Sequence, residues 1–244
     1  MKISLPQGPM SASTTQVACA ACALKQFCLA AAALPPEHSP PTITVNRRRL
    51  RCGQTLYARG DAHAALFAVR AGFLKSCAPL PGGQRQVLGF HIMGDVLGLD
   101  ALGCGVHRSD AVALNGCEVC ELSLPQAERL MESRVAIALH LRALLSEQLA
   151  IAGERIVALG AMSARQRVAS CLLDLALRWA GRGYSPNEFD LCLSRKEMGS
   201  YLGLTFETVS RMLSDFGAHG WIAVDGRKVR ILDRSALQSQ LARA

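Results

Sequence analysis

Short apolar runs separated by glycine-containing turns occupy residues 42–134. Short runs bounded by turns of this kind are typical of antiparallel strands. The pattern therefore predicts an antiparallel β-roll or barrel. Its clearest runs begin at Leu56, Leu66, Gly72, Val87 and Val119.

A different pattern covers residues 135–163, where apolar residues recur at steps of four or three. That spacing is typical of a helix, which at 1.5 Å per residue would run about 40 Å. A helix of this length suits a seam between two copies of the chain, and a buried helix inside one domain has the same pattern. The predicted seam residues are Leu141, Leu145, Leu149, Ala152, Ile156 and Leu159.

A second apolar stripe on this helix favours the dimer seam. Ile137, Leu144 and Ile151 could bind the helix to its own β-roll while the first stripe faces a partner. Glu147 and Glu154 are seven residues apart, so they lie on one side of the helix, where like charges would oppose dimerisation. Glu154 is the better candidate for setting this balance, because no basic residue lies three or four positions away to pair with it.

Two helix starts lie close together near the C-terminus. Ser194 and Glu197 form a capping box, which begins a helix that stops at Gly203. Thr205 provides a second N-cap after a short turn. This spacing predicts a helix-turn-helix.

The second of these helices has one apolar and one polar face. Its polar face carries Glu207, Ser210 and Arg211. An arginine can donate two hydrogen bonds to guanine, a glutamate can accept one from cytosine, and a serine can do either. We therefore predict that these three side chains read bases in a major groove.

A tight hairpin follows the second helix. Asp225-Gly226 lies between two short apolar runs and is a strong hairpin signal. Lys228 and Arg230 on this hairpin would lie near phosphates. The C-terminal domain is therefore predicted to be a winged helix-turn-helix.

Charge and length agree with this organisation. The 244 residues suffice for two modest domains, and a formal net charge of +8 favours polyanionic partners. Residues 164–244 hold 12 Lys and Arg against 8 Asp and Glu, so the predicted DNA-binding part is basic. The other basic concentration, residues 47–51, is predicted to be a solvated strand edge or turn.

The sequence carries no signal for export, membrane insertion or catalysis. Residues 1–17 lack the apolar core of a signal peptide, and charges at Arg142, Glu147, Glu154 and Arg155 interrupt the longest apolar stretch. We therefore expect a cytoplasmic protein, without a membrane partner, whose cysteines are reduced. The six histidines are scattered outside any catalytic motif, so we expect no enzyme.

Three cysteines lie within ten residues, at Cys19, Cys22 and Cys28. Clustered thiols in a reducing compartment indicate metal more often than disulfides. Three clustered thiolates and one distant thiolate are a common ligand set for a cubane iron-sulfur cluster. Zinc, which prefers four closed ligands, stays open on spacing alone.

Several segments resemble the FNR group, the fumarate and nitrate reduction regulators of the CRP/FNR family. The resemblance covers nearly the whole chain from Cys19 onward. It rests on the CxxCx5C turn, residues 89–95 (GFHIMGD), Cys120-Glu121-Leu122 and residues 201–211 (YLGLTFETVSR).

The resemblance implies a [4Fe-4S] cluster on Cys19, Cys22, Cys28 and a fourth cysteine. That cysteine matches Cys120 by the Glu-Leu that follows it, with Cys117 as the alternative. It further implies a homodimer that binds a TTGAT-type DNA palindrome without oxygen and falls to a weakly binding monomer when oxygen degrades the cluster. Residues 83–87 resemble the family's RNA polymerase contact, which suggests an activator.

The expected fold is α+β, with an N-terminal antiparallel β-roll sensory domain, a long dimerisation helix and a C-terminal winged helix-turn-helix. The predicted parts are residues 1–41, a tail with the cysteine turn and a Pro-rich spacer, and residues 42–134, the sensory domain. Residues 135–163 form the dimerisation helix, and residues 164–244 form the DNA-binding domain.

The other large branch of the family gives the alternative function, a cyclic-nucleotide-responsive regulator. That branch uses a Gly-Glu-Leu turn for the ribose and an Arg-Ser pair for the phosphate. This chain has Arg108 and Ser109, but its turn reads Gly98-Leu99-Asp100, so the glutamate is missing. The resemblance therefore favours the iron-sulfur branch.

Overall fold

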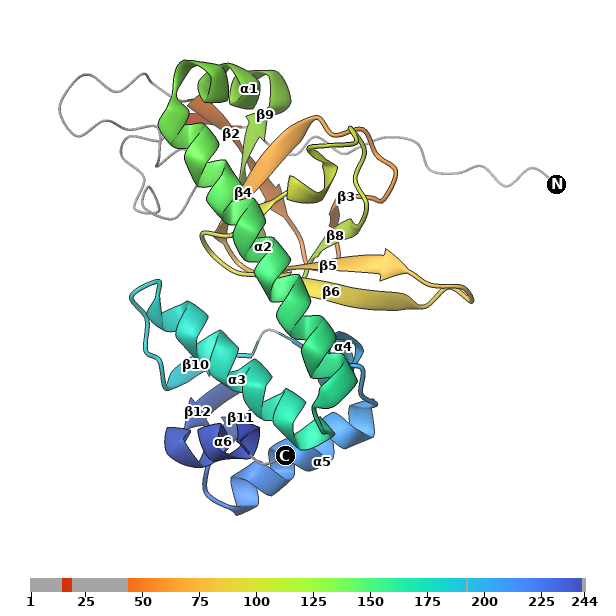
Figure 1. Cartoon of the computed structure of the whole chain (residues 1–244), viewed down its shortest axis with the longest axis vertical. Coiled ribbons are helices and arrows are strands. Elements are labelled where there is room, and N and C mark those ends of the chain that lie inside the picture. Colours follow the sequence, from red (N-terminus) through yellow and green to blue (C-terminus); the bar gives the residue numbers. More distant parts are fainter. Residues whose placement is uncertain (1–14, 19–43, 192, 243–244) are drawn as a thin grey trace. The chain divides into compact units, whose positions relative to one another are not determined.

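The computed structural model describes residues 15–18, 44–191 and 193–242 (Figure 1). The chain forms two compact units. The first holds the described residues up to Leu74 together with His91–Leu141, and the second holds Lys75–Phe90 together with the described residues from Arg142 onward. The predicted α+β class, with antiparallel sheets and a C-terminal helix-turn-helix, is confirmed.

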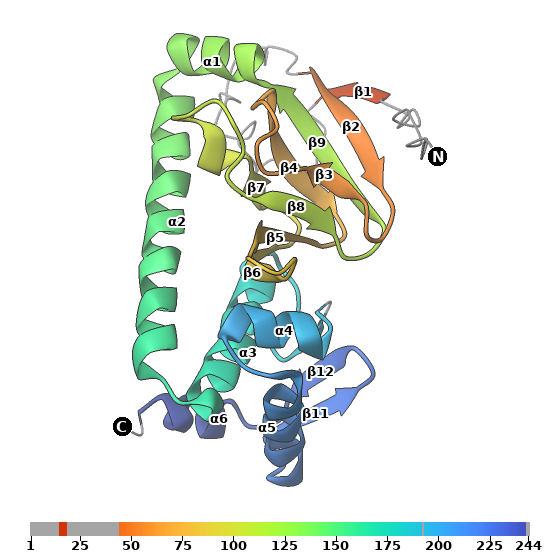
Figure 2. The same cartoon turned by 90° about the vertical axis from the view of Figure 1, so that its right-hand side faces the viewer.

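The β-roll is built from two antiparallel sheets (Figure 2). One sheet has the order β1-β2-β9-β4-β7, formed by β1 (Thr15–Ala18), β2 (Thr44–Leu50), β9 (Cys117–Ser123), β4 (Ala65–Ala71) and β7 (Val96–Leu97). The other has the order β3-β8-β5-β6, formed by β3 (Thr55–Tyr57), β8 (Asp110–Ala113), β5 (Leu74–Pro79) and β6 (Arg85–His91). A short 3-10 helix, η3 (Leu99–Ala101), follows β7.

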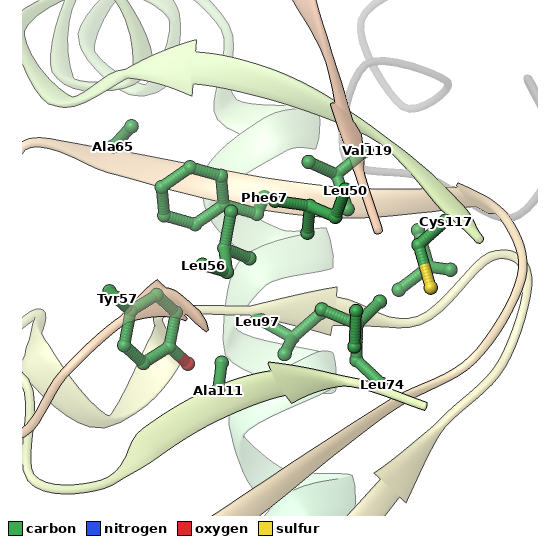
Figure 3. Close-up of a cluster of buried hydrophobic side chains, with 12 residues drawn as sticks. Leu50, Leu56, Tyr57, Ala65, Phe67, Leu74, Leu97, Ala111, Cys117 and Val119 are labelled. Carbon is green, nitrogen blue, oxygen red and sulfur yellow. The ribbon is translucent and has the colours of Figure 1, made fainter. Parts of the chain in front are cut away.

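The roll's core lies on the inner faces of these strands (Figure 3). On β9 the inward positions are Cys117 and Val119, which are 4% and 0% exposed. Because successive side chains point to opposite faces of a strand, Glu118 and Cys120 lie on the outer face. Farther along, α1 (Leu124–Ser133) contacts β4 and β9. The apolar pattern did not predict this helix, which has proline in its first turn.

The arginine run of residues 47–51 lies mostly on β2, which pairs with β9 along residues 46–50. On the other side β1 pairs only with residues 44–47, so Arg48 and Arg49 have one neighbouring strand among the described residues. Arg49 and Arg51 are exposed, as expected of a solvated strand edge or turn. Arg47 differs, because it lies between two strands and is half-buried.

The long helix is confirmed as α2 (Val135–Ala161), a single continuous helix in Figure 1. Most of the predicted seam is open within one chain, with Leu149 78% exposed and Ile156 73% exposed. Leu141 differs, since it is buried by its own chain. Of the second stripe, Ile137 is buried as predicted, whereas Ile151 is exposed.

The apolar length of α2 bears on the expectation that the protein has no membrane-spanning helix. By length and composition alone, α2 is long enough and apolar enough to cross a bilayer. The four charged residues thus interrupt the stretch less than predicted, because residues 135–152 contain only two of them. A single helix of this kind is weak evidence for a span, since an apolar stripe serves equally well as a contact between proteins.

The second unit carries four further helices among the described residues. These helices are α3 (Ala164–Ala180), α4 (Arg195–Leu202), α5 (Phe206–Ala218) and α6 (Arg234–Leu241). The sequence predicted α4 and α5, but it did not predict α3 and α6. A three-stranded sheet of order β10-β12-β11 accompanies them, formed by β10 (Glu188–Asp190), β11 (Ile222–Asp225) and β12 (Lys228–Ile231).

Arg167 on α3 fastens the ends of two helices in this unit. Its guanidinium donates to the carbonyl oxygens of Leu159 at 3.0 Å and Met162 at 2.9 Å, near the end of α2. It also donates to Leu202 at 3.0 Å, at the end of α4. The last carbonyls of a helix lack partners within the helix and carry partial negative charge, so one cation satisfies both termini.

Candidate DNA-binding and sensory sites

The helix-turn-helix begins at the predicted capping box. The Ser194 hydroxyl accepts from the Glu197 amide at 3.1 Å, and the Glu197 carboxylate accepts from the Ser194 amide at 2.9 Å. α4 ends at Gly203, which has a φ of 63°. A side chain at Gly199 would approach the carbonyl oxygen of Leu204 to 2.7 Å, so glycine permits the tight turn.

α5 has the predicted division into two faces. Thr205 caps it by accepting from the Thr208 amide at 3.3 Å, and Val209, Leu213 and Phe216 are buried. On the other face, Glu207 and Arg211 are exposed.

The polar side chains of α5 differ in how they are held. A hydrogen bond from its own backbone and another from Thr205 lower the pKa of Glu207, so this side chain is an anionic acceptor at neutral pH. Ser210 is half-buried, and its hydroxyl has no hydrogen-bond partner among the described residues. This oxygen is itself buried, so within one chain it is less open to a ligand than the exposed side chains of Glu207 and Arg211.

The wing is the predicted hairpin of β11 and β12, but its charge is more balanced than predicted. Lys228 and Arg230 are exposed on β12. Lys228 pairs in register with Asp225 on β11 and with Asp190 on β10, and Arg230 pairs with Glu188. Because β10 was not predicted, these acidic neighbours were missed. They reduce the attraction of the wing for phosphate.

The hairpin of β5 and β6 belongs to the second unit and binds α4. The Lys75 ammonium lies 2.7 Å from the Glu197 carboxylate, and the Val87 amide donates to the Ser200 hydroxyl at 2.9 Å. The Gln86 side chain donates to the Ser200 carbonyl. Burial raises the pKa of Glu197, but hydrogen bonds from Lys75 and Ser194 outweigh it and hold this pKa below its usual range.

The two candidate fourth ligands of a cluster lie on opposite faces of β9. The Cys117 thiol points into the core, where it donates to the Phe73 carbonyl at 2.9 Å (Figure 3). Burial raises the pKa of this thiol, which makes it a poor source of thiolate. Cys120 is half-buried on the outer face. The packing therefore favours Cys120 as a ligand.

Charged side chains surround this outer face of the roll. Glu118 lies 2.7 Å from Arg70, 3.2 Å from Arg49 and 3.6 Å from Arg47. Burial raises the pKa of Glu118, but hydrogen bonds from Arg49 and Arg70 and the charge of Arg47 bring this pKa below its usual range. Three cations around one anion leave a net positive face beside Cys120.

Cys19, Cys22 and Cys28 lie outside the described residues, so their positions cannot be compared with Cys120 directly. Within the described parts of the chain, no group of three or more His, Cys, Asp or Glu side chains forms a metal site. The described strand that precedes Cys19 in the sequence is β1, which lies two strands from β9 in the same sheet.

Arg108 and Ser109, the pair that resembles a phosphate-binding site for a cyclic nucleotide, form hydrogen bonds within the chain. The Asp100 carboxylate accepts from the Arg108 amide at 2.9 Å and from the Ser109 hydroxyl at 3.1 Å. The Arg108 guanidinium donates to the Cys104 sulfur at 3.2 Å. Nearby, Tyr57 stacks on the buried His107, with ring centroids 3.6 Å apart.

Two family profiles match the chain, one for each half. Residues 47–134 match the cyclic nucleotide-binding domain, and residues 166–240 match the Crp-like helix-turn-helix domain. Together with the sheets and the helix-turn-helix described above, these matches define a transcriptional regulator with a β-roll and a DNA-binding domain.

Whole-chain relatives identify the family. The transcriptional regulatory protein btr of Bordetella pertussis is 38% identical over 90% of this chain and 91% of that protein. The fumarate and nitrate reduction regulatory protein of Escherichia coli is 35% identical over 92% of this chain and 90% of that protein. The chain therefore belongs to the CRP/FNR family of transcriptional regulators, which are not enzymes.

A solved structure agrees with this assignment. FixK2 from Bradyrhizobium japonicum is 30% identical to the chain, with a TM-score of 0.75, over 82% of this chain and 98% of that one. The structure of TTHB099 from Thermus thermophilus, at 24% identity and a TM-score of 0.64, shares the fold.

Proposed function

We propose that this protein is an oxygen-sensing transcriptional regulator of the FNR type. In this proposal Cys19, Cys22, Cys28 and Cys120 hold a [4Fe-4S] cluster, and the loaded protein is a homodimer that binds a TTGAT-type palindrome without oxygen. When bound, the cluster supplies an iron-sulfur centre that oxygen can oxidise. The observation that carries the proposal is the outward position of Cys120 in the sheet that contains β1.

The strand register relates β1 to the strand of Cys120. Thr15 on β1 lies opposite Arg47 on β2, which lies opposite Cys120 on β9. Two strand spacings separate β1 from β9, or about 10 Å. The segment from Cys19 to Cys28 follows β1 directly in the sequence, so the proposal requires it to fold back toward Cys120.

The chemistry of Cys120 fits this role. A ligand must be a thiolate that the cluster can reach, and Cys120 is half-buried on the outer face, with Arg47 directly opposite it on β2. Positive charge nearby favours the thiolate. Cys117 lacks both features, because its thiol donates a hydrogen bond inside the core.

The DNA-binding half of the proposal assigns base reading to α5 and backbone contact to the wing. Glu207, Ser210 and Arg211 share the polar face of α5, whose opposite face holds the helix in the domain. The second helix of a helix-turn-helix enters the major groove. Lys228 and Arg230 on the wing would contact phosphates.

Arg211→Ala and Arg230→Ala should separate these two roles. We expect Arg211→Ala to cost about 1 to 3 kcal/mol at one defined base pair and to relax preference there, because a paired contact to one base is lost. Arg230→Ala, like Lys228→Ala, should weaken binding to all sequences alike and shallow the salt dependence by at most roughly one unit. Their acidic neighbours in the sheet limit the effect.

Binding titrations on a TTGAT-type palindrome and its single-base variants, at two salt concentrations, measure both effects. Folding of each variant is checked by circular dichroism. If Arg211→Ala weakens every site equally while Arg230→Ala changes base preference, the recognition element has been assigned to the wrong place.

The proposed homodimer uses α2. Four apolar side chains along α2 are exposed in one chain: Leu145, Leu149, Ile156 and Leu159. An exposed apolar surface of this kind marks a contact with another protein chain. Leu141 is buried within its own chain, so the seam begins near Leu145. Ala152 is also exposed along it. Glu154 is exposed as well, but it lies five residues after Leu149 and two before Ile156, so it faces the other side of the helix and is not a seam residue.

The remaining assignments are a partner and a compartment. The turn between β5 and β6 is exposed over residues 81–85, which supports residues 83–85 of the predicted segment as a surface for RNA polymerase and the protein as an activator. Gln86 and Val87 bind Ser200 on α4 instead. DNA as the partner, and thiolates that must stay reduced, place the protein in the cytoplasm without a membrane partner.

The internal contacts of Asp100 disfavour the alternative, a cyclic-nucleotide-responsive regulator. Arg108 and Ser109 would have to bind a phosphate, but both donate to Asp100, and the Arg108 side chain is held by Cys104. A carboxylate at this place also repels the anion.

An anaerobic assay of iron and sulfide tests the proposal. We expect the purified protein to contain about four of each per chain and to absorb visible light like other thiolate-bound cubanes. Zinc without sulfide, or tight binding of a cyclic nucleotide to a colourless protein, would contradict it.

A further inference from the structure

The arginine run of residues 47–51 begins beside the proposed cluster ligand. Arg47 and Arg49 on β2 lie on the same face of the sheet as Cys120 and Glu118 on β9. Pairing across the strands is direct, with Arg47 opposite Cys120 and Arg49 opposite Glu118. The side chains of directly opposite residues lie within contact range.

On its other side β9 pairs with β4, so rows of side chains run across β2, β9 and β4. Ala68 on β4 lies opposite Cys120, while Arg70 reaches Glu118 at 2.7 Å. The row of Cys120 therefore contains one cation, Arg47, and the row of Glu118 contains two. We define Arg47, Arg49 and Arg70 with Glu118 as the arginine face.

Arg47 is held between the two rows. Its guanidinium Nε lies 3.6 Å from the Glu118 carboxylate, diagonally across the strands. Its side chain is 29% exposed, against 79% for Arg49. The Nε atom is itself buried and makes no hydrogen bond among the described residues. A half-buried cation with an unused donor, next to a proposed ligand, is suited to an anionic partner.

A thiolate-bound cubane is such a partner. A two-plus core with four thiolates carries a formal charge of about minus two, and nearby charge and hydrogen bonds to sulfur set its potential. A cluster held by Cys120 and the N-terminal thiolates would supply a centre that can give one electron to dioxygen, forming superoxide and leaving the centre with a charge of about minus one. Arg47 would stabilise the more negative state and so would oppose this oxidation.

We propose that the charge of Arg47 stabilises the cluster against oxidation and sets how readily oxygen switches the protein off. This inference rests on the proposed function. Arg47 is not a ligand and acts on the cluster through its charge, from the opposite strand. Arg70 contributes from the next row, and Arg49 is too exposed to contribute much.

Four variants test the proposal: Arg47→Gln, Arg47→Lys, Arg49→Gln and Glu118→Gln. Each is purified without oxygen, assayed for iron and sulfide, and mixed with air-saturated buffer while the cluster absorbance is followed. Thermal unfolding by circular dichroism shows whether each variant keeps its fold. The midpoint potential of the cluster is measured by dye-mediated titration.

We expect Arg47→Gln to load fully and to lose the cluster about fivefold faster in air, with a lower midpoint potential. Arg47→Lys keeps the charge and should stay within about twofold of wild type, and Arg49→Gln should match wild type. Glu118→Gln adds a net positive charge to the arginine face and should lose the cluster more slowly.

The outcomes separate this inference from the proposed function. A wild-type protein without iron and sulfide would overturn both. A loaded wild type with unchanged rate and potential in Arg47→Gln would overturn the role of Arg47 alone. An Arg47→Lys variant as labile as Arg47→Gln would do the same, because it would show that packing of the arginine stem, and not its charge, protects the cluster.

Discussion

Cys120→Ser is expected to abolish cluster binding, whereas Cys117→Ser should keep a full complement of iron and sulfide. The two thiols lie three residues apart but on opposite faces of β9, so one can reach a cluster on the outer face and the other cannot. The measurement is the iron and sulfide content of each anaerobically purified variant, together with its visible absorption spectrum.

Folding stability supplies the control for this pair. Cys117→Ser places a hydroxyl in the core, which we expect to cost about 1 to 3 kcal/mol of unfolding free energy. Cys120→Ser alters a half-buried position and should cost less. A Cys117→Ser variant that keeps its fold but loses the cluster, beside a loaded Cys120→Ser, would move the fourth ligand to Cys117.

Leu149→Glu and Ile156→Glu should each give a folded monomer that binds the palindrome at least about 100-fold more weakly. Both side chains are exposed in one chain, so the substitution leaves the monomer's core intact. In a dimer, a charge in the apolar seam has no partner and carries a large desolvation cost. Losing the dimer removes the second half-site contact, which is why affinity falls so far.

Sedimentation without oxygen measures the state of each variant. Val157→Glu is a matched control, because Val157 is 58% exposed and lies beside the stripe on the outward side of the helix. We expect this variant to remain a dimer with normal DNA affinity. An unchanged dimer in Leu149→Glu and Ile156→Glu would show that α2 is not the seam.

The DNA-binding elements could be predicted because their signals are local. The capping box at Ser194, the stop at Gly203 and the Asp225-Gly226 turn each depend on a few adjacent residues. The structure has each feature where the sequence placed it. The polar face of α5 follows from the same short-range periodicity.

What could not be predicted depends on contacts between distant residues. β10 is only three residues long and exists because it pairs with β12, so the acidic neighbours of Lys228 and Arg230 had no signal in the sequence. The position of Arg47 between two strands depends on its pairing with β9, about seventy residues away. Leu141 fits the seam pattern, but it is buried within its own chain.

The choice of Cys120 over Cys117 draws on both the local sequence and the packing of distant residues. Resemblance pointed to Cys120 through the Glu121-Leu122 that follow it, while the spacing alone left either thiol possible. The strand's alternation then gave a physical reason, since an inward Cys117 is held by the core. The N-terminal ligands remain a prediction from sequence, because Cys19, Cys22 and Cys28 lie outside the described residues.

The most direct test of oxygen sensing follows DNA affinity and cluster content in one sample. Anaerobic protein is titrated with a TTGAT-type palindrome, exposed to air for increasing times, and titrated again, with iron and sulfide measured at each point. We predict that affinity falls in step with the loss of the cluster and that sedimentation shows dimer becoming monomer. Affinity that stays constant while the cluster disappears would contradict the central claim.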